Sequence, residues 1–341
     1  MAFAMMWATV CTLAVPFITS ANYLLLDFFL VQVALGVFGT GGNVFVRRIW
    51  GPDAATFYQF LLFMYGLGSL VAPLIAAPFL TPGVGDENVA DLMLVYPYSG
   101  SAVVMLVTAV FAFVLWRVSP ETPVHAMREA EERKELVDSS NSGSKKKWKT
   151  LTIILAMVFM FFYQGLEISF ADMLTTFAVK SDLRLSKVTG AEMTTLYFST
   201  FTIFRLITAY YVRFTGSTAA LAGSLVFMLA VASGIFLPFA NNSETMLWVG
   251  SGLLGTAMSA LYGCVFSFLE EYFLVGSSAT AIITVAANAG QILLTVLFSM
   301  MIDSLSSVFV FVIFVYALVM SVTFIMMLMV LHFKIGKMGG N

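Results

Sequence analysis

Apolar residues form ten long runs along the chain, and short polar segments separate them. A membrane-spanning helix needs about 20 mostly apolar residues, a length that these runs reach. None of them alternates between polar and apolar positions as the strands of an outer-membrane barrel do. The pattern predicts an all-α membrane protein with ten transmembrane helices, near 2–19, 23–46, 59–80, 98–116, 151–179, 191–212, 218–239, 245–271, 278–300 and 305–332.

The longest polar segment, 117–150, divides the helices into four before it and six after it. It combines mixed charges, a Ser-rich stretch and the basic run 145–147, and such a composition cannot bury a core. We expect an incomplete four-helix bundle at 1–116, a flexible cytoplasmic linker at 117–150 and a six-helix bundle at 151–341. The basic run is typical of a topology signal, and lipid binding is the alternative.

Composition excludes several classes of protein. Of the 341 residues, 60% are hydrophobic and 11% are charged, whereas soluble domains carry about 25% charged residues. A net charge of -2 argues against a nucleic-acid partner, because phosphate binding needs clustered Lys and Arg. The two cysteines, Cys11 and Cys264, lie in apolar runs, so we expect neither a disulfide framework nor a metal site. We expect no enzyme and no cofactor.

The Lys and Arg residues predict the orientation, because cytoplasmic loops carry an excess of them. The first run lacks a charged leader and a good cleavage site, which favours a retained helix over a signal peptide. If both termini are cytoplasmic, thirteen of the 17 basic residues lie inside. They are Arg47, Arg48, Arg117, Arg128, Arg133, Lys134, Lys145, Lys146, Lys147, Lys149, Arg213, Lys334 and Lys337.

Polar residues inside apolar runs are candidate functional residues, since a charged group at the centre of a membrane helix costs about 2.5–3.5 kcal/mol on insertion scales. Gln164 and Glu167 are three residues apart and share one helix face. They predict a ligand or ion site, with a structural hydrogen bond between helices as the alternative.

Four amide side chains extend this candidate site. Asn288 and Gln291 share a face of one run, and Gln32 and Asn43 lie in another. Amides both donate and accept hydrogen bonds, which suits a neutral, hydroxyl-rich substrate, although hydrogen bonding between helices is an equal alternative for Asn288 and Gln291.

Charged residues nearer the helix ends are predicted to have architectural or gating roles. Arg205 lies about two helical turns from Arg213, so we expect its side chain to extend toward the cytoplasmic face in an architectural role, with substrate binding as the alternative. Glu270 and Glu271 end a helix, where a gate and a plain interfacial pair are both consistent with the sequence.

Several motifs resemble the major facilitator superfamily, in its fucose-permease-related branch that includes sodium-dependent glucose transporter-like proteins. The stretch 36–73, with Gly41-Gly42-Asn43 and Gly66-Leu67-Gly68-Ser69, is similar to that branch's fourth and fifth helices. The segment 163–169 resembles its seventh helix, with an acid at Glu167. Arg205-Leu206 with Arg213, and the segment 267–272, resemble its eighth and tenth helices.

The resemblance covers nearly the whole chain and implies two helix bundles of six helices each, working by alternating access. The first apolar run corresponds to the third helix, so this chain would be a truncated two-bundle fold that lacks the first two helices. Gly39 stands where bacterial relatives carry a proton-coupling carboxylate, and Phe204 replaces the usual glycine before the arginine.

These observations lead to one functional hypothesis and one alternative. The hypothesis is a secondary active transporter, in the plasma membrane, of a hexose-like sugar or other small polar solute. The resemblance implies the sugar, and sodium as the coupling ion. The alternative is a non-transporting truncated isoform that acts through a full-length membrane partner. A channel is a third class, but no ring of like charges supports it.

Overall fold

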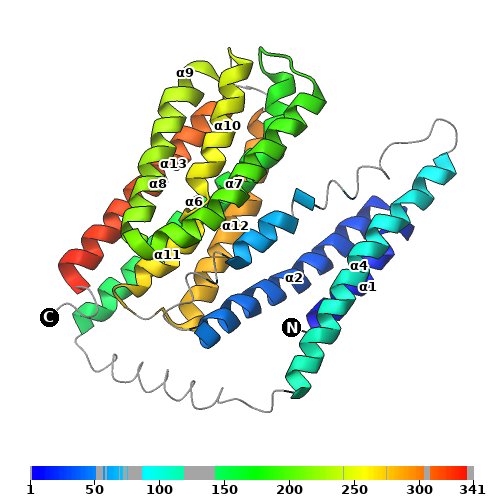
Figure 1. Ribbon diagram of the computed structural model, residues 1–341, viewed down its shortest axis with the longest axis horizontal. Coiled ribbons are helices and arrows are strands. Elements are labelled where there is room, and N and C mark those ends of the chain that lie inside the picture. Colours follow the sequence, from blue (N-terminus) through cyan, green and yellow to red (C-terminus); the bar gives the residue numbers. More distant parts are fainter. Residues whose placement is uncertain are drawn as a thin grey trace. The chain divides into compact units, whose positions relative to one another are not determined.

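The computed structural model describes residues 2–50, 57, 60–68, 70–71, 75, 87–118, 143–240, 242–273, 275–302 and 308–335. Every regular element in these ranges is a helix (Figure 1). The prediction of an all-α fold is therefore confirmed. The chain divides into two compact units, one formed by Met1–Ile49 and Val71–Arg133 and the other by Trp50–Leu70 and Lys134–Asn341.

The first unit contains α1 (Ala2–Ala14), a short 3-10 turn (Val15–Phe17), α2 (Ala21–Trp50) and α4 (Glu87–Val118). Helices α1 and α4 lie side by side. The buried face of α1 includes Thr9 and Thr12 among apolar residues, and the Thr12 hydroxyl bonds the Met105 sulfur of α4 at 3.5 Å.

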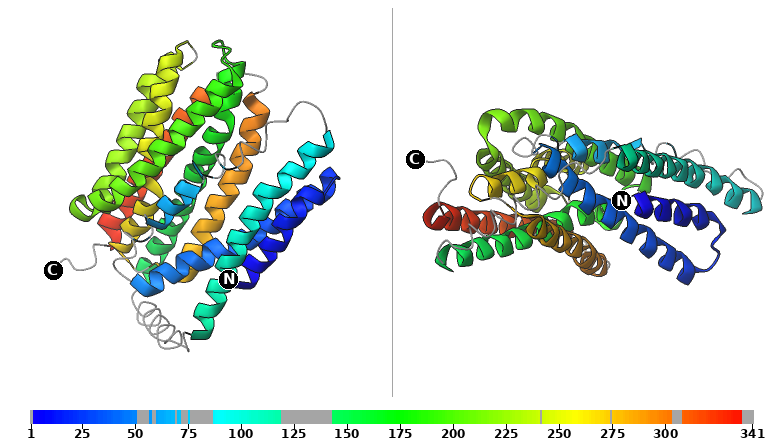
Figure 2. Two further views of the ribbon diagram at one scale, coloured as in Figure 1. Left: turned by 45° about the vertical axis from the view of Figure 1, so that its right-hand side comes forward. Right: turned by 90° about the horizontal axis from the view of Figure 1, so that it is seen from below.

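The second unit holds the remaining helices of the described chain (Figure 2). Its helices bury the larger hydrophobic core. Helical residues 60–68, here called the 60–68 segment, also belong to this unit. Its other elements are α6 (Gly143–Lys180), α7 (Lys187–Thr215), α8 (Ser217–Val231), a π-helical turn (Ala232–Phe236), α9 (Leu237–Phe239), α10 (Glu244–Met258), α11 (Leu261–Glu270), α12 (Ser277–Ile302), α13 (Val308–Val330) and a second π-helical turn (Leu331–Ile335).

Local sequence signals set the ends of α7. Ser186 caps its start, where the Ser186 hydroxyl accepts a hydrogen bond of 3.0 Å from the Thr189 backbone N–H. Gly216 ends it with φ of 79°, a left-handed backbone angle that glycine adopts without steric penalty. The connection from α7 to α8 is therefore a single residue, and the two helices turn sharply between Thr215 and Ser217.

Helices α6 and α12 pack closely against each other and run in the same direction (Figures 1 and 2). A Cβ atom added at Gly290 of α12 would overlap the Phe161 backbone of α6, and one added at Gly165 of α6 would overlap the Leu294 side chain. Small residues allow such close approach of helices in a membrane. The Ser169 and Thr295 hydroxyls add a hydrogen bond of 2.9 Å between the helices.

Most hydroxyl groups of the helices bond the carbonyl of the preceding turn on their own helix. Ser101 and Thr108 of α4 do so at 2.9 and 2.8 Å. Thr195 and Ser199 of α7 do the same at 2.9 and 2.7 Å. A hydroxyl bonded in this way satisfies its donor within one helix, and it adds no link between helices.

Seven helices of the described chain are long and apolar enough to cross a membrane, namely Asn22–Gly39, Val95–Val114, Lys147–Lys180, Ser217–Phe239, Glu244–Glu270, Ser278–Met301 and Phe309–Phe333. The predicted run 2–19 corresponds to a shorter apolar helix, Ala2–Phe17. The run 191–212 corresponds to the hydroxyl-rich α7, and the run 59–80 lies partly outside the described residues. The predicted linker 117–150 falls largely on 119–142, also outside them, and the domain boundaries remain a prediction.

Candidate functional site

A buried ion pair lies in the middle of the second unit. Glu167 of α6 is 3% exposed and Arg205 of α7 is 1% exposed. The Arg205 Nη2 atom lies 3.5 Å from the Glu167 Oε1 atom. Within a membrane span neither charge would be tolerated alone, because the surrounding medium has a low dielectric constant. The two helices therefore place opposite charges where each compensates the other.

The Arg205 guanidinium also has three neutral partners. Its Nη2 donates a hydrogen bond of 3.4 Å to the Tyr163 hydroxyl, and its Nη1 donates one of 3.1 Å to the Leu62 carbonyl oxygen. The guanidinium carbon lies 3.9 Å from the centre of the Phe201 ring, close enough for a cation–π interaction. Four contacts from three parts of the chain thus hold this side chain.

Aromatic side chains surround the Glu167–Arg205 pair. The Tyr197 hydroxyl donates to the Glu167 backbone carbonyl at 3.5 Å and contacts the Met258 sulfur at 3.6 Å. The Tyr197 ring stacks on Phe201 with ring centres 5.8 Å apart and contacts Phe170 at 4.9 Å. This apolar shell strengthens the attraction between the charges.

Three buried polar atoms around the pair have no hydrogen-bond partner among the described residues. They are Glu167 Oε2, Arg205 Nε and Thr202 Oγ1. Leaving a buried donor or acceptor unpaired typically costs about 1–3 kcal/mol, and native proteins contain few such atoms. Their clustering at one place indicates a site where a ligand or a change of conformation completes the hydrogen bonding.

The other predicted residues of α6 and α12 lie on these two packed helices, at different levels along the helix axis. Gln164 and Gln291 are partly exposed, and Asn288 is exposed. Because Gly290 lies beside Phe161, Asn288 is level with a position near 159. A rise of about 1.5 Å per residue then places Asn288 roughly 12 Å along the helix axis from Glu167. Gln291 and Gln164 lie between these two levels.

The two predicted residues of the first unit are both on α2. Gln32 is exposed. The side chain of Asn43 lies outside the described residues. Their part in a substrate site remains a prediction.

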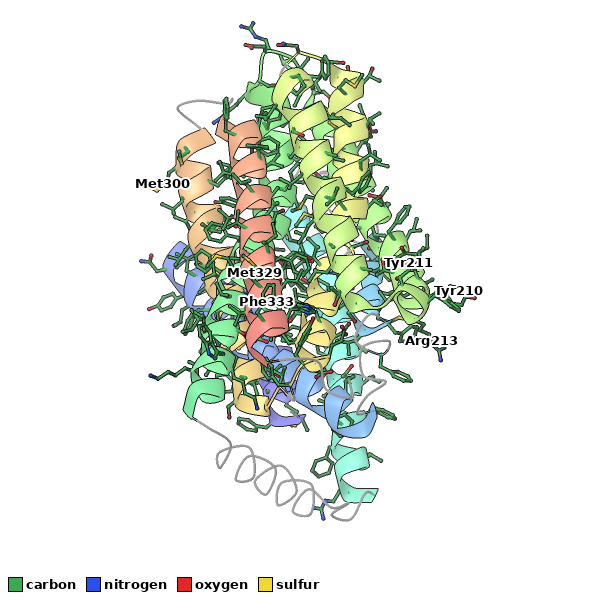
Figure 3. All side chains as sticks on the ribbon, turned by 90° about the vertical axis from the view of Figure 1, so that its left-hand side faces the viewer. Tyr210, Tyr211, Arg213, Met300, Met329 and Phe333 are labelled. Atoms are coloured by element: carbon green, nitrogen blue, oxygen red, sulfur yellow. The ribbon has the colours of Figure 1, made fainter. Side chains whose placement is uncertain are left out.

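The expected direction of the Arg205 side chain is wrong. We expected it to extend toward the cytoplasmic face, but it is buried and pairs with Glu167. The carboxylate one helix away offers the guanidinium a closer partner than the interface does. Arg213 in the last turn of α7 is exposed and points outward beside Tyr210 and Tyr211 (Figure 3). Basic and tyrosine side chains at a helix end are typical of a membrane–water interface.

Glu270 and Glu271 lie where α11 ends, and both are partly exposed. The Glu271 Oε2 atom accepts a hydrogen bond of 3.0 Å from the Thr218 hydroxyl in the first turn of α8. This bond ties the end of α11 to the start of α8. It is compatible with both predicted roles, a gate and an interfacial pair.

A second buried carboxylate, Asp27 of α2, was not recognised from the sequence. It is 8% exposed, and its Oδ2 atom has no hydrogen-bond partner among the described residues. The Cys11 thiol of α1 lies near this carboxylate. The available signal was a lone acid at the fifth position of the predicted run 23–46, which is easily attributed to the interface.

The contrast between the two carboxylates leads to a prediction. Glu167 has a cationic partner, whereas Asp27 forms no ion pair with any residue that the structure describes. Removing the charge of Asp27 in Asp27→Asn therefore strands no buried cation, and we expect the free energy of unfolding to change by less than about 1 kcal/mol. Thermal unfolding in detergent measures this. A loss of about 3–5 kcal/mol, the size expected when one member of a buried ion pair is removed, would show that Asp27 has a partner of opposite charge.

Two solved membrane symporters share the fold. A structure of the Escherichia coli fucose:proton symporter FucP matches 96% of this chain and 82% of its own, with a TM-score of 0.73 and 14% sequence identity. The proton:xylose symporter XylE matches 96% of this chain and 78% of its own, with a TM-score of 0.70 and 14% identity. At this level of identity the likeness establishes the fold alone.

Curated relatives and a family model complete the comparison. Human sodium-dependent glucose transporter 1 is 22% identical over 310 residues, which are 83% of this chain and 57% of the human protein. Mouse sodium-dependent glucose transporter 1A is 24% identical over 305 residues, 81% of this chain and 68% of its own. The chain thus spans between about half and two thirds of these relatives. The model of the Major Facilitator Superfamily matches residues 1–295. The chain therefore belongs to the major facilitator superfamily, a family of multi-pass membrane transporters and not of enzymes.

Proposed function

We propose that this protein is a secondary active transporter that moves a hexose-like sugar, or another small polar solute, by alternating access, with sodium as the coupling ion. The observation that carries the proposal is the buried Glu167–Arg205 pair, which joins the candidate membrane span of α6 to α7 in a major facilitator fold. Ionisable groups at such a depth mark substrate and ion pathways. The names of the relatives support sugar and sodium as the class of substrate and ion.

The chemistry of the site supports a hydroxyl-rich solute. A carboxylate oxygen such as Glu167 Oε2 accepts hydrogen bonds from sugar hydroxyls and also binds a monovalent cation. Gln164 on the same helix face supplies a donor and an acceptor in one side chain. Asn288 and Gln291 continue this amide chemistry toward the start of α12. We place the protein in the plasma membrane with both termini cytoplasmic, in line with the charge of the loops.

Uptake of labelled glucose in cells that express the chain tests the proposal, with sodium replaced by N-methylglucamine in parallel. We expect sodium-dependent uptake by the parental chain, and a fall of at least about tenfold per surface molecule in Glu167→Gln, since a hydrogen bond to a charged group is worth that factor or more. Asp172→Asn is the matched control, because Asp172 is an exposed acid on the same helix.

A paired variant separates folding from transport. Glu167→Gln with Arg205→Gln removes both charges together, so we expect it to reach the surface and to remain inactive. Undiminished uptake in this variant would remove the pair from the transport site. A parental chain that reaches the surface and takes up no solute would contradict transport by this chain alone, and co-purification with a longer relative would then favour action through a partner.

A further inference from the structure

The 60–68 segment is held against α7 at two points. Arg205 Nη1 bonds the Leu62 carbonyl oxygen, and Gly66 lies against Thr202 so closely that a Cβ atom at position 66 would overlap the Thr202 hydroxyl. A helical carbonyl has a second lone pair beyond the one used within its own helix, and Arg205 occupies it. The bond links the 60–68 segment to the same side chain that neutralises Glu167.

Arg205 therefore divides its donors between two partners with different charges. Nη2 faces the Glu167 carboxylate and Nη1 faces the neutral Leu62 carbonyl. The position of the whole guanidinium depends on Glu167, since the other groups in contact with it are neutral. Glu167 Oε2, Arg205 Nε and Thr202 Oγ1 are left without partners in the described part of the chain, so this arrangement does not satisfy its own hydrogen bonds.

Neutralising Glu167 would remove the reason for Arg205 to remain buried. An arginine cannot lose its proton in a protein, so without a carboxylate beside it the guanidinium must move toward water or another anion. Such a movement breaks the bond to the Leu62 carbonyl. We propose that Arg205 is a latch that holds the 60–68 segment on α7, and that binding of a monovalent cation at Glu167 releases it.

The titratable groups near Glu167 fit this role. Tyr163 lies on the same helix, Tyr197 and Arg205 come from α7, and Tyr65 comes from the 60–68 segment itself. The tyrosines are neutral in their ordinary state, so Arg205 supplies the charge that a bound cation would replace. The latch deepens the proposed function, and it rests on that function only for the identity of the cation.

Disulfide cross-linking can follow the latch directly. The two native cysteines are free and buried, and they would first be replaced in Cys11→Ala with Cys264→Ala. Gly66→Cys with Thr202→Cys then reports the state in which the 60–68 segment is held on α7. An ideal Cβ at position 66 lies 3.2 Å from the Thr202 Cβ, which is a few tenths of an ångström short of the usual Cβ–Cβ spacing in a disulfide. Ser169→Cys with Thr295→Cys, on α6 and α12, is the matched control pair.

The rate of cross-linking is compared under two pairs of conditions. The first pair is sodium chloride and N-methylglucamine chloride, both at neutral pH. The second pair is neutral and mildly acidic pH, both without sodium. We expect the cation to slow cross-linking of the 66–202 pair about tenfold relative to the 169–295 pair, the effect of losing one charge-assisted hydrogen bond. The ratio of the two rates is the readout, because acid lowers the thiolate fraction of both pairs. A fall of this ratio in sodium identifies the cation as sodium, and a fall in acid alone identifies it as a proton. In Glu167→Gln, cross-linking should be slow under every condition.

Three results would overturn the latch. They are equal cross-linking of the 66–202 pair under all conditions, a parental rate in Glu167→Gln, or an equal response of the control pair. The readout does not depend on transport. A cation response without solute uptake would therefore uphold the latch and reject the proposed substrate, whereas uptake without a cation response would do the reverse.

Discussion

Removing one member of the Glu167–Arg205 pair is expected to destabilise the protein by about 3–5 kcal/mol, because the other charge is then buried without compensation. Glu167→Gln should be the more damaging change. It strands a guanidinium that cannot lose its proton, whereas Arg205→Met strands a carboxylate that can take one up. Thermal or denaturant unfolding of the purified protein in detergent measures both losses.

The double variant Glu167→Gln with Arg205→Met supplies the control. It replaces both charges by groups of similar size, so most of the loss should be recovered, as found when buried pairs are replaced as a unit. The stabilities of the four proteins give a coupling energy between the two side chains. Losses that simply add in the double variant would mean that the two charges do not compensate each other, and that the contact of 3.5 Å has no energetic significance.

Gly290→Ala is expected to cost about 1–3 kcal/mol, because the added methyl group would overlap backbone atoms of Phe161 on α6. A side chain in that place could rotate away, but a helix backbone can only move as a whole. The change should therefore push α12 away from α6 and weaken the Ser169–Thr295 hydrogen bond. Unfolding in detergent, with the yield of folded protein as a second measure, detects it.

Gly223→Ala on α8 is the matched control. A Cβ atom at position 223 would meet no atom within 4 Å, so the same methyl group there should be neutral or stabilise the helix by up to about 1 kcal/mol. Gly165→Ala should fall between the two, because its methyl group meets mainly the flexible Leu294 side chain. Equal effects at 290 and 223 would contradict close backbone packing between α6 and α12.

The length of the apolar runs was sufficient to predict the helices, and Glu167 was recognised as an acid within such a run. The partner of Glu167 could not be predicted. Arg205 is 38 positions further along the chain on another helix, and its pairing depends on which faces of α6 and α7 meet. The position of Arg205 along its helix suggested that its side chain reaches the interface, but the contact with Glu167 on another helix keeps it buried.

The register between α6 and α12 was the second feature that could not be predicted from the sequence. Asn288 and Gln291 were grouped with Glu167 because their amides suit a hydroxyl-rich substrate. The contact of Gly290 with Phe161 fixes α12 against α6 and places Asn288 away from the level of Glu167. A glycine in an apolar run carries no sign of what it contacts, so the sequence does not reveal this register. Asp27 was missed because an acid near the start of a run resembles an interfacial residue.

The hydroxyls bonded within their own helices determine which serine and threonine positions of this chain tolerate substitution. Among the described residues, the Ser101 and Thr108 hydroxyls of α4 bond only the carbonyl of the preceding turn. Each residue therefore contributes a small side chain to its surroundings and no hydrogen bond to another helix. Such positions should exchange freely among serine, threonine and alanine over evolutionary time. Ser169 and Thr295 have no such freedom, since each hydroxyl is half of a contact between helices. Of two identical residue types in this chain, one is therefore replaceable and the other is constrained, and only the partner of the hydroxyl distinguishes them.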